Sequence, residues 1–153
     1  MTAHDFTLTA LDHTPLPLAP FAGRPLLLVN TASLCGFTGQ YAALQRLYEE
    51  YGPRGLTVVA IPSNDFGGQE PGNPGATCAR FKVAFPVAEK AHVKGPEAIP
   101  LFQWLATQAG ALGRPRWNFY KYVIAPDGSL ARWFSSITKP DARPLRATIE
   151  RLF

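Results

Sequence analysis

The chain has 153 residues, of which 46% are hydrophobic and 17% are charged, a balance typical of a folded domain. This composition excludes a mainly disordered chain, and a chain of this length buries roughly two-thirds of the surface that its unfolded form exposes. Two cysteines exclude a framework of several disulfides, and Cys35 and Cys78 lie in no zinc-binding pattern. We therefore expect one domain, residues 1–153, in which any cysteine chemistry is thiol or redox chemistry.

The net charge of +4 comes from 15 Lys and Arg residues against 11 Asp and Glu residues. A nucleic-acid-binding face needs such cations in one stripe, interleaved with aromatic side chains, but here they are scattered along the sequence. A solvated basic surface is therefore the better interpretation, and we expect no nucleic-acid partner. A mild preference for anionic partners or substrates stays open.

The sequence has no segment typical of targeting or of a membrane span. Residues 1–12 lack a basic start and an apolar run of signal-peptide length, and no later stretch approaches the roughly 20 apolar residues of a membrane span. We therefore expect a cytoplasmic protein. Paired cysteines in the cytoplasm tend to be catalytic or redox-sensing, because stable disulfides are uncommon there.

The first half of the chain predicts a β-hairpin followed by a βαβ unit. Residues 6–18 alternate between apolar and polar around a turn, which predicts a short hairpin. The apolar runs Pro25–Asn30 and Leu56–Ile61 predict buried strands, and a helical stripe predicts a helix over Gln40–Tyr51. The handedness rule makes this unit a parallel right-handed crossover, so the fold class is α/β.

The next part of the chain is poorer in regular structure. Residues 63–75 are rich in Gly and Pro and predict an irregular segment, and a short helix is expected at Thr77–Phe81. A further helix is expected at Pro100–Gln108, because proline is tolerated in the first turn of a helix.

The last part of the chain predicts an antiparallel strand pair and a closing helix. Strands are expected at Phe119–Ile124 and Leu130–Phe134, joined by the turn Ala125–Gly128. Apolar residues at helical spacing after Pro140 predict the closing helix.

Cys35 lies in the turn between the first buried strand and the following helix. Backbone N–H groups at a helix start stabilise an anion, so this position favours the thiolate, which is the nucleophilic form of cysteine. The alternative is a small buried apolar residue, since free Cys is among the most buried residue types. Open α/β folds bind their ligands at the C-terminal edge of the parallel sheet, so we favour a functional Cys35.

Thr38 stands where a redox C-x-x-C motif beginning at Cys35 would have its second thiol. Thiol-disulfide exchange between near neighbours is therefore impossible. A lone activated thiolate fits attack on an electrophile such as a peroxide oxygen, which gives a sulfenic acid that another thiol must reduce.

Three segments closely resemble, in order and spacing, the signature segments of the glutathione peroxidase family: Val29–Thr38, Pro62–Gly72 and Trp117–Phe119. The resemblance extends from about Phe6 to Phe153. It implies a thioredoxin-like fold, with a central mixed sheet flanked by helices and an N-terminal β-hairpin. It also implies an antioxidant enzyme that reduces hydrogen peroxide and organic hydroperoxides without a metal or organic cofactor.

The resemblance implies that Cys35 is the peroxidatic residue and that Gln69, Trp117 and Asn118 complete the catalytic tetrad of the family. The Gln69 amide and the Trp117 indole N–H are neutral donors that can stabilise a thiolate and a departing oxygen, and Asn118 can donate similarly. Taken singly, these three residues are more simply explained as a loop residue, a core residue and a turn residue. Only their joint spacing with Cys35 indicates a site.

Cys78 resembles the resolving cysteine of the thioredoxin-dependent, two-cysteine branch of the family, with an inert buried thiol as the alternative. In that branch the resolving segment unwinds to deliver its thiol. Residues 71–76 suit such opening, because their Gly- and Pro-rich sequence has a low helix propensity. The expected reaction is peroxide reduction through a Cys35 sulfenic acid, then a Cys35–Cys78 disulfide, then recycling by thioredoxin.

Two alternatives stay open at this point. In the first, glutathione is the reductant and Cys78 takes no part. In the second, the chain is a redox sensor, in which oxidised Cys35 passes its oxidation to a partner protein. The segment formed by residues 107–116 is short and lacks the insertion that tetrameric members of the family use for assembly. This difference implies a monomer or a weak dimer.

Overall fold

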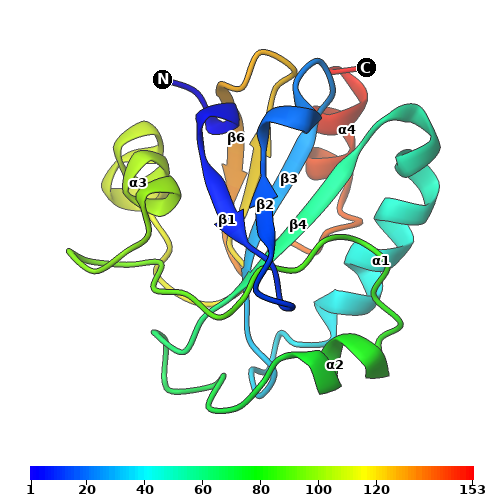
Figure 1. Cartoon of the computed structure of the whole chain (residues 1–153). Coiled ribbons are helices and arrows are strands. Elements are labelled where there is room, and N and C mark those ends of the chain that lie inside the picture. The colour runs from blue at the N-terminus through cyan, green and yellow to red at the C-terminus, as the bar shows by residue number, and fades with distance from the viewer.

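The structure is a computed structural model that describes residues 1–153. Its centre is a sheet in the order β4-β3-β5-β6 (Figure 1). The parallel pair is followed by two antiparallel neighbours, which confirms the expected mixed sheet. The strands are β3 (Leu26–Thr31), β4 (Thr57–Pro62), β5 (Lys121–Ile124) and β6 (Leu130–Phe134).

Helices and a small hairpin surround this sheet. The hairpin consists of β1 (Thr7–Thr9) and β2 (Pro15–Pro17), as the alternating N-terminal pattern predicted. The helices are α1 (Gln40–Tyr51), α2 (Gly75–Arg80), α3 (Pro100–Gly113) and α4 (Arg143–Glu150). Short 3₁₀ turns lie at Ala3–Asp5, Ala19–Phe21 and Gly52–Arg54.

The central strands are buried on both faces because alternate residues enter two apolar clusters. In β3, Leu27 and Val29 join the cluster that α1 and α4 cover. Leu26 and Leu28 join the other cluster, which the hairpin and α3 cover. Figure 1 shows α3 and α1 on opposite sides of the sheet. This two-sided burial explains why the strand sequences are continuously apolar instead of alternating.

Several elements differ from the sequence prediction at their ends: β3 and β4 each lie one residue further along the chain, and α2 spans Gly75–Arg80 instead of Thr77–Phe81. α3 continues past Gln108 to Gly113, because Gly110 has a φ of 76° and joins a further turn across a kink. β5 begins at Lys121 instead of Phe119, because Phe119 has a φ of 64°, which a strand residue does not adopt. The predicted bounds of α1 and β6 are confirmed.

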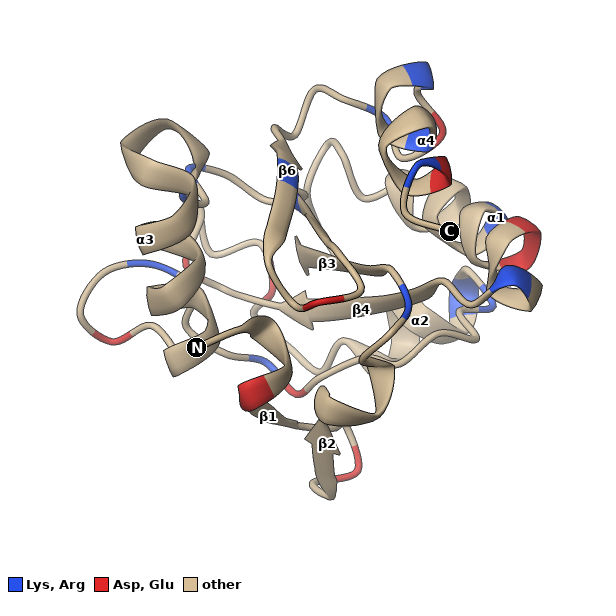
Figure 2. Cartoon of the chain, turned by 90° about the horizontal axis from the view of Figure 1, so that it is seen from above, with Lys and Arg blue, Asp and Glu red and all other residues tan.

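The helices all lack the combination of length and apolar character that crossing a membrane requires. Figure 2 shows Lys and Arg on α1, α4 and β6 and in several loops, with acidic residues among them.

Candidate active site

Cys35 lies in a tight turn between β3 and α1, as the sequence predicted. Its N–H donates to Thr38 Oγ1 at 3.0 Å, and its carbonyl accepts from the Thr38 N–H at 3.0 Å. The same Thr38 hydroxyl donates to the Ala32 carbonyl at 2.8 Å. Thr38, which stands where a C-x-x-C motif would have its second cysteine, therefore closes the loop that holds Cys35.

The sulfur of Cys35 accepts a hydrogen bond from the Phe37 N–H at 3.4 Å, and Cys35 is 8% exposed. α1 begins only at Gln40, so this amide belongs to the turn before the helix and not to the first turn of the helix. A backbone N–H directed at a sulfur stabilises negative charge on it. The sequence analysis expected a backbone N–H donor at the start of the helix. The donor in the structure is the Phe37 N–H, in the turn before α1.

Three loops meet beyond the C-terminal ends of β3 and β4, at the lower end of the sheet in Figure 1. The Leu34 N–H, next to Cys35, donates to the Gln69 carbonyl at 3.0 Å. Asn118 Nδ2 donates to Gln69 Oε1 at 3.0 Å. These bonds join the three segments that carry the resemblance, although they lie far apart in the sequence.

Asn118 is fully buried, and its amide nitrogen is directed at Gln69. Because this bond occupies the carbonyl oxygen of Gln69, both hydrogens of the Gln69 amide nitrogen stay available for another acceptor. In the structure, Asn118 therefore orients the Gln69 amide. The sequence analysis expected Asn118 itself to donate to the thiolate or the departing oxygen, as Gln69 does.

Trp117 lies between the two apolar clusters and contacts both, including the cluster that contains Cys35. Its ring centroid is 6.0 Å from that of Phe66. Gly67 lies so close that a Cβ at this position would be 3.0 Å from the Trp117 ring, and its φ of 67° also favours glycine. The loop that carries Gln69 is therefore shaped around Trp117.

Asn30, at the end of β3, is a supporting residue that the sequence analysis did not identify. Its Nδ2 donates to the Trp117 carbonyl at 2.9 Å, and its own carbonyl accepts from the Phe119 N–H at 2.6 Å. Asn30 is fully buried. It holds the backbone on both sides of Asn118, including the left-handed Phe119. The sequence signal that could have identified Asn30 is a polar residue at the end of an apolar strand.

Lys121 is a second support that the sequence analysis missed. Its Nζ donates to the carbonyls of Ser135 at 3.1 Å and Ser136 at 3.3 Å, and the Ser136 hydroxyl donates to the Asn118 carbonyl. Lys121 is fully buried, and burial lowers its pKa to about 7. A cation within the otherwise apolar β5 was the signal that could have identified it.

Cys78 lies on α2, is 8% exposed and, like Cys35, is a free thiol. Burial raises the pKa of Cys78; hydrogen bonding with the neighbouring Tyr41 hydroxyl opposes this shift, and the charge of Glu70 adds to it. The thiol is therefore protonated and a poor nucleophile in this conformation. α2 itself has only six residues; its N-cap residue Pro74 makes no side-chain cap, and Asn73 Oδ1 accepts from the Gly75 N–H at 2.8 Å.

Glu70 is a buried carboxyl group beside the site, with 1% of its surface exposed. Burial raises the pKa of Glu70, while the neighbouring Ser33 and the charge of Lys90 oppose the shift. Lys90 Nζ also donates to the carbonyls of Glu70 at 3.0 Å and Gly72 at 3.2 Å. Lys90 thereby holds the segment between Gln69 and α2 in place.

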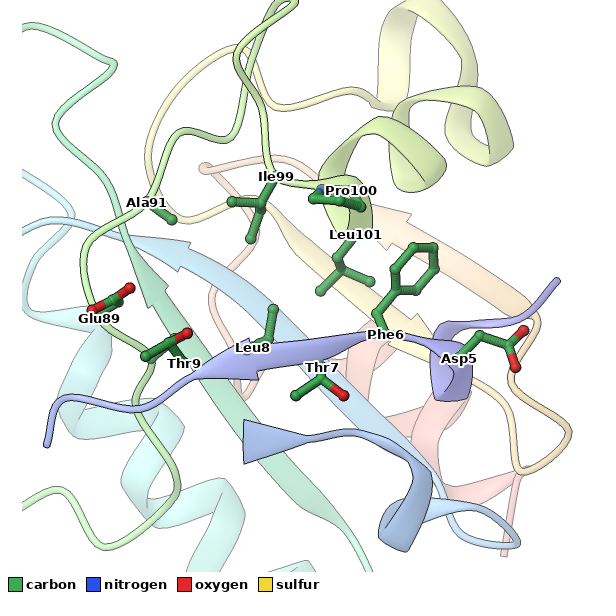
Figure 3. A pocket seen from close by; sticks show the side chains of 11 residues that line it. Asp5, Phe6, Thr7, Leu8, Thr9, Glu89, Ala91, Ile99, Pro100 and Leu101 are labelled. Atoms are coloured by element: carbon green, nitrogen blue, oxygen red, sulfur yellow. The ribbon is translucent and has the colours of Figure 1, made fainter. Parts of the chain in front are cut away.

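Two hollows border α3. A groove of about 1100 Å³ runs from Trp117 along residues 92–98 to α3. A smaller cavity of about 230 Å³ lies beside β1, where Phe6 and Leu8 point toward Ile99 and Leu101 (Figure 3). No residue of the expected tetrad lines the smaller cavity, whereas Trp117 lines the groove.

The fold and the reactive turn define a class of thiol-dependent oxidoreductases with a thioredoxin-like fold. The crystal structure of T. cruzi GPX1 superposes with a TM-score of 0.79 and 31% identity, covering 99% of this chain and 94% of that chain. The family model described as glutathione peroxidase matches residues 3–106. The chain belongs to the glutathione peroxidase family.

Two relatives indicate the chemistry of this family. The hydroperoxy fatty acid reductase gpx1 of Synechocystis sp. is 43% identical over 163 residues, which cover 99% of this chain and 95% of the relative. The glutathione peroxidase-like peroxiredoxin gpx1 of Schizosaccharomyces pombe is 40% identical over 136 residues, which cover 85% and 86%. The protein is a thiol peroxidase, a peroxide-reducing oxidoreductase, as the sequence predicted.

Proposed function

We propose that peroxide oxidises Cys35, that Gln69 and Trp117 donate hydrogen bonds during this step, and that Asn118 orients Gln69. The observation that carries the proposal is the hydrogen-bonded meeting of the three loops around Cys35. The thiolate attacks one peroxide oxygen, the O–O bond breaks, and the sulfur becomes a sulfenic acid. The departing oxygen takes a proton and leaves as water or an alcohol. Neutral donors stabilise the negative charge that develops on this oxygen.

In the second step, the sulfur of Cys78 attacks the sulfenic sulfur of Cys35 and releases water, which leaves a disulfide. The two thiols of thioredoxin then reduce this disulfide and become oxidised themselves. The free Cys78 and its short helix support this step, as does the name peroxiredoxin of the S. pombe relative. Because the Cys78 thiol is buried with a raised pKa, α2 opens before the thiol reacts.

We further propose that residues 1–153 work as one domain, as a monomer or weak dimer in the cytoplasm. Both cysteines must return to free thiols in each cycle, which a reducing compartment such as the cytoplasm favours.

The experiment that tests the proposal measures peroxide turnover with thioredoxin, with glutathione and with neither, for the natural chain, Cys35→Ser and Cys78→Ser. We expect turnover with thioredoxin only, and none in Cys35→Ser. Cys78→Ser should consume one equivalent of peroxide and then stall, and excess peroxide should drive its Cys35 to the sulfinic acid. Mass spectrometry after a stoichiometric pulse should identify a peptide pair linked through Cys35 and Cys78.

Other outcomes contradict specific parts of the proposal. More than a few per cent of turnover in Cys35→Ser overturns the role of Cys35. Undiminished turnover of Cys78→Ser with glutathione makes Cys78 a bystander. Rapid oxidation of Cys35 without recycling by either reductant, but with transfer to a partner protein, indicates a redox sensor instead.

A further inference from the structure

A buried polar network lies behind Asn118, around the segment that follows β6. The Ser136 hydroxyl donates to the Asn118 carbonyl. Ser136 is 5% exposed, and Asn118 is fully buried. A buried donor or acceptor that loses its partner costs free energy, so this bond holds the two segments firmly together. A fourth segment, outside the three that carry the family resemblance, thereby reaches the proposed site.

The backbone of Ser136 is itself held from two directions. Its carbonyl accepts from Gln40 Nε2 at 2.7 Å and from Lys121 Nζ at 3.3 Å. Lys121 Nζ also donates to the Ser135 carbonyl at 3.1 Å. Gln40 is the first residue of α1, and Lys121 is the first residue of β5. Ser136 is therefore fixed by the two elements that follow the Cys35 turn and the Asn118 segment.

Lys121 takes part in this network at a cost to stability. It is fully buried, opposite Val29 of β3 and Phe134 of β6. None of the ion pairs of the molecule involves Lys121, and burial of a charge without an ionic partner is unfavourable. The favourable contacts of its amine are the bonds to the Ser135 and Ser136 carbonyls. Since an apolar side chain would avoid the cost of burying an amine, the lysine indicates that these two bonds serve the site.

The backbone around Asn118 is held at three consecutive residues. Asn30 Nδ2 donates to the Trp117 carbonyl at 2.9 Å, and the Asn30 carbonyl accepts from the Phe119 N–H at 2.6 Å. Ser136 binds the carbonyl between these two groups, that of Asn118 itself. Phe119 has a φ of 64°, a conformation that a residue other than glycine keeps only with such support.

The direction of the Asn118 amide depends on this backbone. Asn118 Nδ2 donates to Gln69 Oε1 at 3.0 Å, and no protein group donates to Asn118 Oδ1. The amide group therefore has one hydrogen bond to the rest of the protein, and no second bond corrects its orientation. Because a hydrogen bond weakens steeply as its angle closes, a small shift of the Asn118 backbone weakens the contact with Gln69.

We propose that Ser136 is a positioning residue of this peroxidase site. Its hydroxyl fixes the Asn118 carbonyl, and Lys121 fixes the backbone of Ser136 in turn. The Asn118 amide thereby stays directed at Gln69. This inference rests on the proposed function of Gln69 and adds the segment after β6 to the three loops around Cys35. Ser136 and Lys121 act through Asn118 and not on the peroxide.

The test measures single-turnover oxidation of Cys35 by hydrogen peroxide in stopped flow, so that no reductant takes part. Ser136→Ala should slow this step by about threefold to tenfold, because one buried hydrogen bond contributes roughly that factor. Ser136→Thr keeps the hydroxyl and should stay within about twofold of the natural chain. Lys121→Met should slow the step by a factor similar to that of Ser136→Ala, because the Ser135 and Ser136 carbonyls lose their lysine donor.

The same two substitutions in a Gln69→Ala background separate positioning from general damage. If Ser136 and Lys121 act by orienting Gln69, each should change the rate of Gln69→Ala by less than about twofold, since no amide is left to orient. A merely structural role would slow Gln69→Ala as much as it slows the natural chain.

Thr148→Ala is the matched control for lost stability. Thr148 is also 5% exposed, and its hydroxyl donates to the Pro144 carbonyl at 2.8 Å within α4. Thermal melting should show that this variant loses stability as Ser136→Ala does, while its Cys35 oxidation keeps the rate of the natural chain.

A natural rate in Ser136→Ala overturns the positioning role, and so does an equal loss of rate in Thr148→Ala. A further loss of about threefold or more on adding Ser136→Ala to Gln69→Ala also overturns it. If Ser136→Ala does not fold, Lys121→Met carries the same comparison. The failure of the proposed function is separate: in that case Gln69→Ala itself is oxidised at the natural rate.

Discussion

Thr38 binds both Cys35 and Ala32 through one hydroxyl oxygen, so the geometry of the reactive turn depends on a single side chain. In a C-x-x-C motif this position supplies a second reactive sulfur. Here it supplies two hydrogen bonds and no redox chemistry. The consequence at the residue scale is that a second thiol from this chain can come only from elsewhere in the fold, and Cys78 is the one other cysteine of the chain.

Gln69 and Asn118 act through one hydrogen bond in the proposed site, so their substitutions should not be additive. Gln69→Ala should slow sulfenic acid formation by roughly 10²–10³, because a donor to the transition state is lost. Asn118→Ala should slow it less, since the Gln69 amide remains but is no longer oriented. The double variant should be no slower than Gln69→Ala alone. Stopped-flow measurement of Cys35 oxidation by hydrogen peroxide checks all three rates.

Circular dichroism and thermal melting serve as the control for these variants, because Asn118 is fully buried and its loss costs stability as well. If the rate losses of the two single variants multiplied in the double variant, Asn118 would not work through Gln69. A Gln69→Ala rate equal to that of the natural chain would remove Gln69 from the site.

At the scale of elements, the proposed second step requires α2 to move. It has only six residues, and the one side-chain bond at its start is from the Gly75 N–H to Asn73 Oδ1 at 2.8 Å. Its packing comes from Phe81, which stacks on Tyr41 at 5.7 Å, and from the buried Cys78. A helix of this length is marginal without tertiary contacts, so its opening is a local event that leaves the central sheet intact.

Ala79→Gly should therefore accelerate disulfide formation. Ala79 is exposed on α2, and glycine lowers helix stability by about 1 kcal/mol, which increases the open population roughly fivefold. Sulfenic acid formation on Cys35 should keep its rate, since that step precedes opening. Acid quenching after a stoichiometric peroxide pulse, followed by mass spectrometry, resolves the two steps.

Ala111→Gly, an exposed position on α3, is the matched control and should change neither rate. If Ala79→Gly formed the disulfide at the rate of the natural chain, opening of α2 would not limit the second step.

For the whole molecule, the buried Lys121 connects stability to pH. Its pKa is about 7 in the folded chain, lowered by burial, whereas a free lysine has a pKa of about 10.4. Below pH 7 both states bind the proton, and the folded state carries the full cost of a buried charge. Between these two values the unfolded chain binds more protons than the folded chain, so the free energy of unfolding rises with pH.

Lys121→Met removes this titration while keeping a long side chain. The free energy of unfolding of the natural chain should rise, relative to the variant, by an amount on the order of 3 kcal/mol between pH 7 and 9.5. Urea denaturation of the reduced proteins across this range measures the difference. Lys139→Met, at an exposed position, should follow the pH dependence of the natural chain. Parallel curves for the natural chain and Lys121→Met would show that Lys121 does not release its proton in this range.

The elements that the sequence predicted well are those whose signal is local. The continuous apolar runs of β3 and β4 and the helical stripe of α1 lie within the elements themselves, so the pattern was sufficient to place them. The ends of β5 and α3 were wrong, because the left-handed conformation of Phe119 depends on neighbours elsewhere in the fold and Gly110 lets α3 continue across a kink. The backbone at Phe119, for example, is held by Asn30 from a different strand.

By itself, the sequence determined the α/β class, the turn that holds Cys35 and the family to which the chain belongs. Each of these follows from residue type and spacing along the chain. Only the tertiary structure decided that Asn118 is directed at Gln69 and that Asn30 holds Trp117, 87 residues away. It also decided that the Cys78 thiol on α2 is buried. The physical reason is that hydrogen bonding, desolvation and charge pairing depend on distances in space, which exist only once the strands have paired and the loops have met.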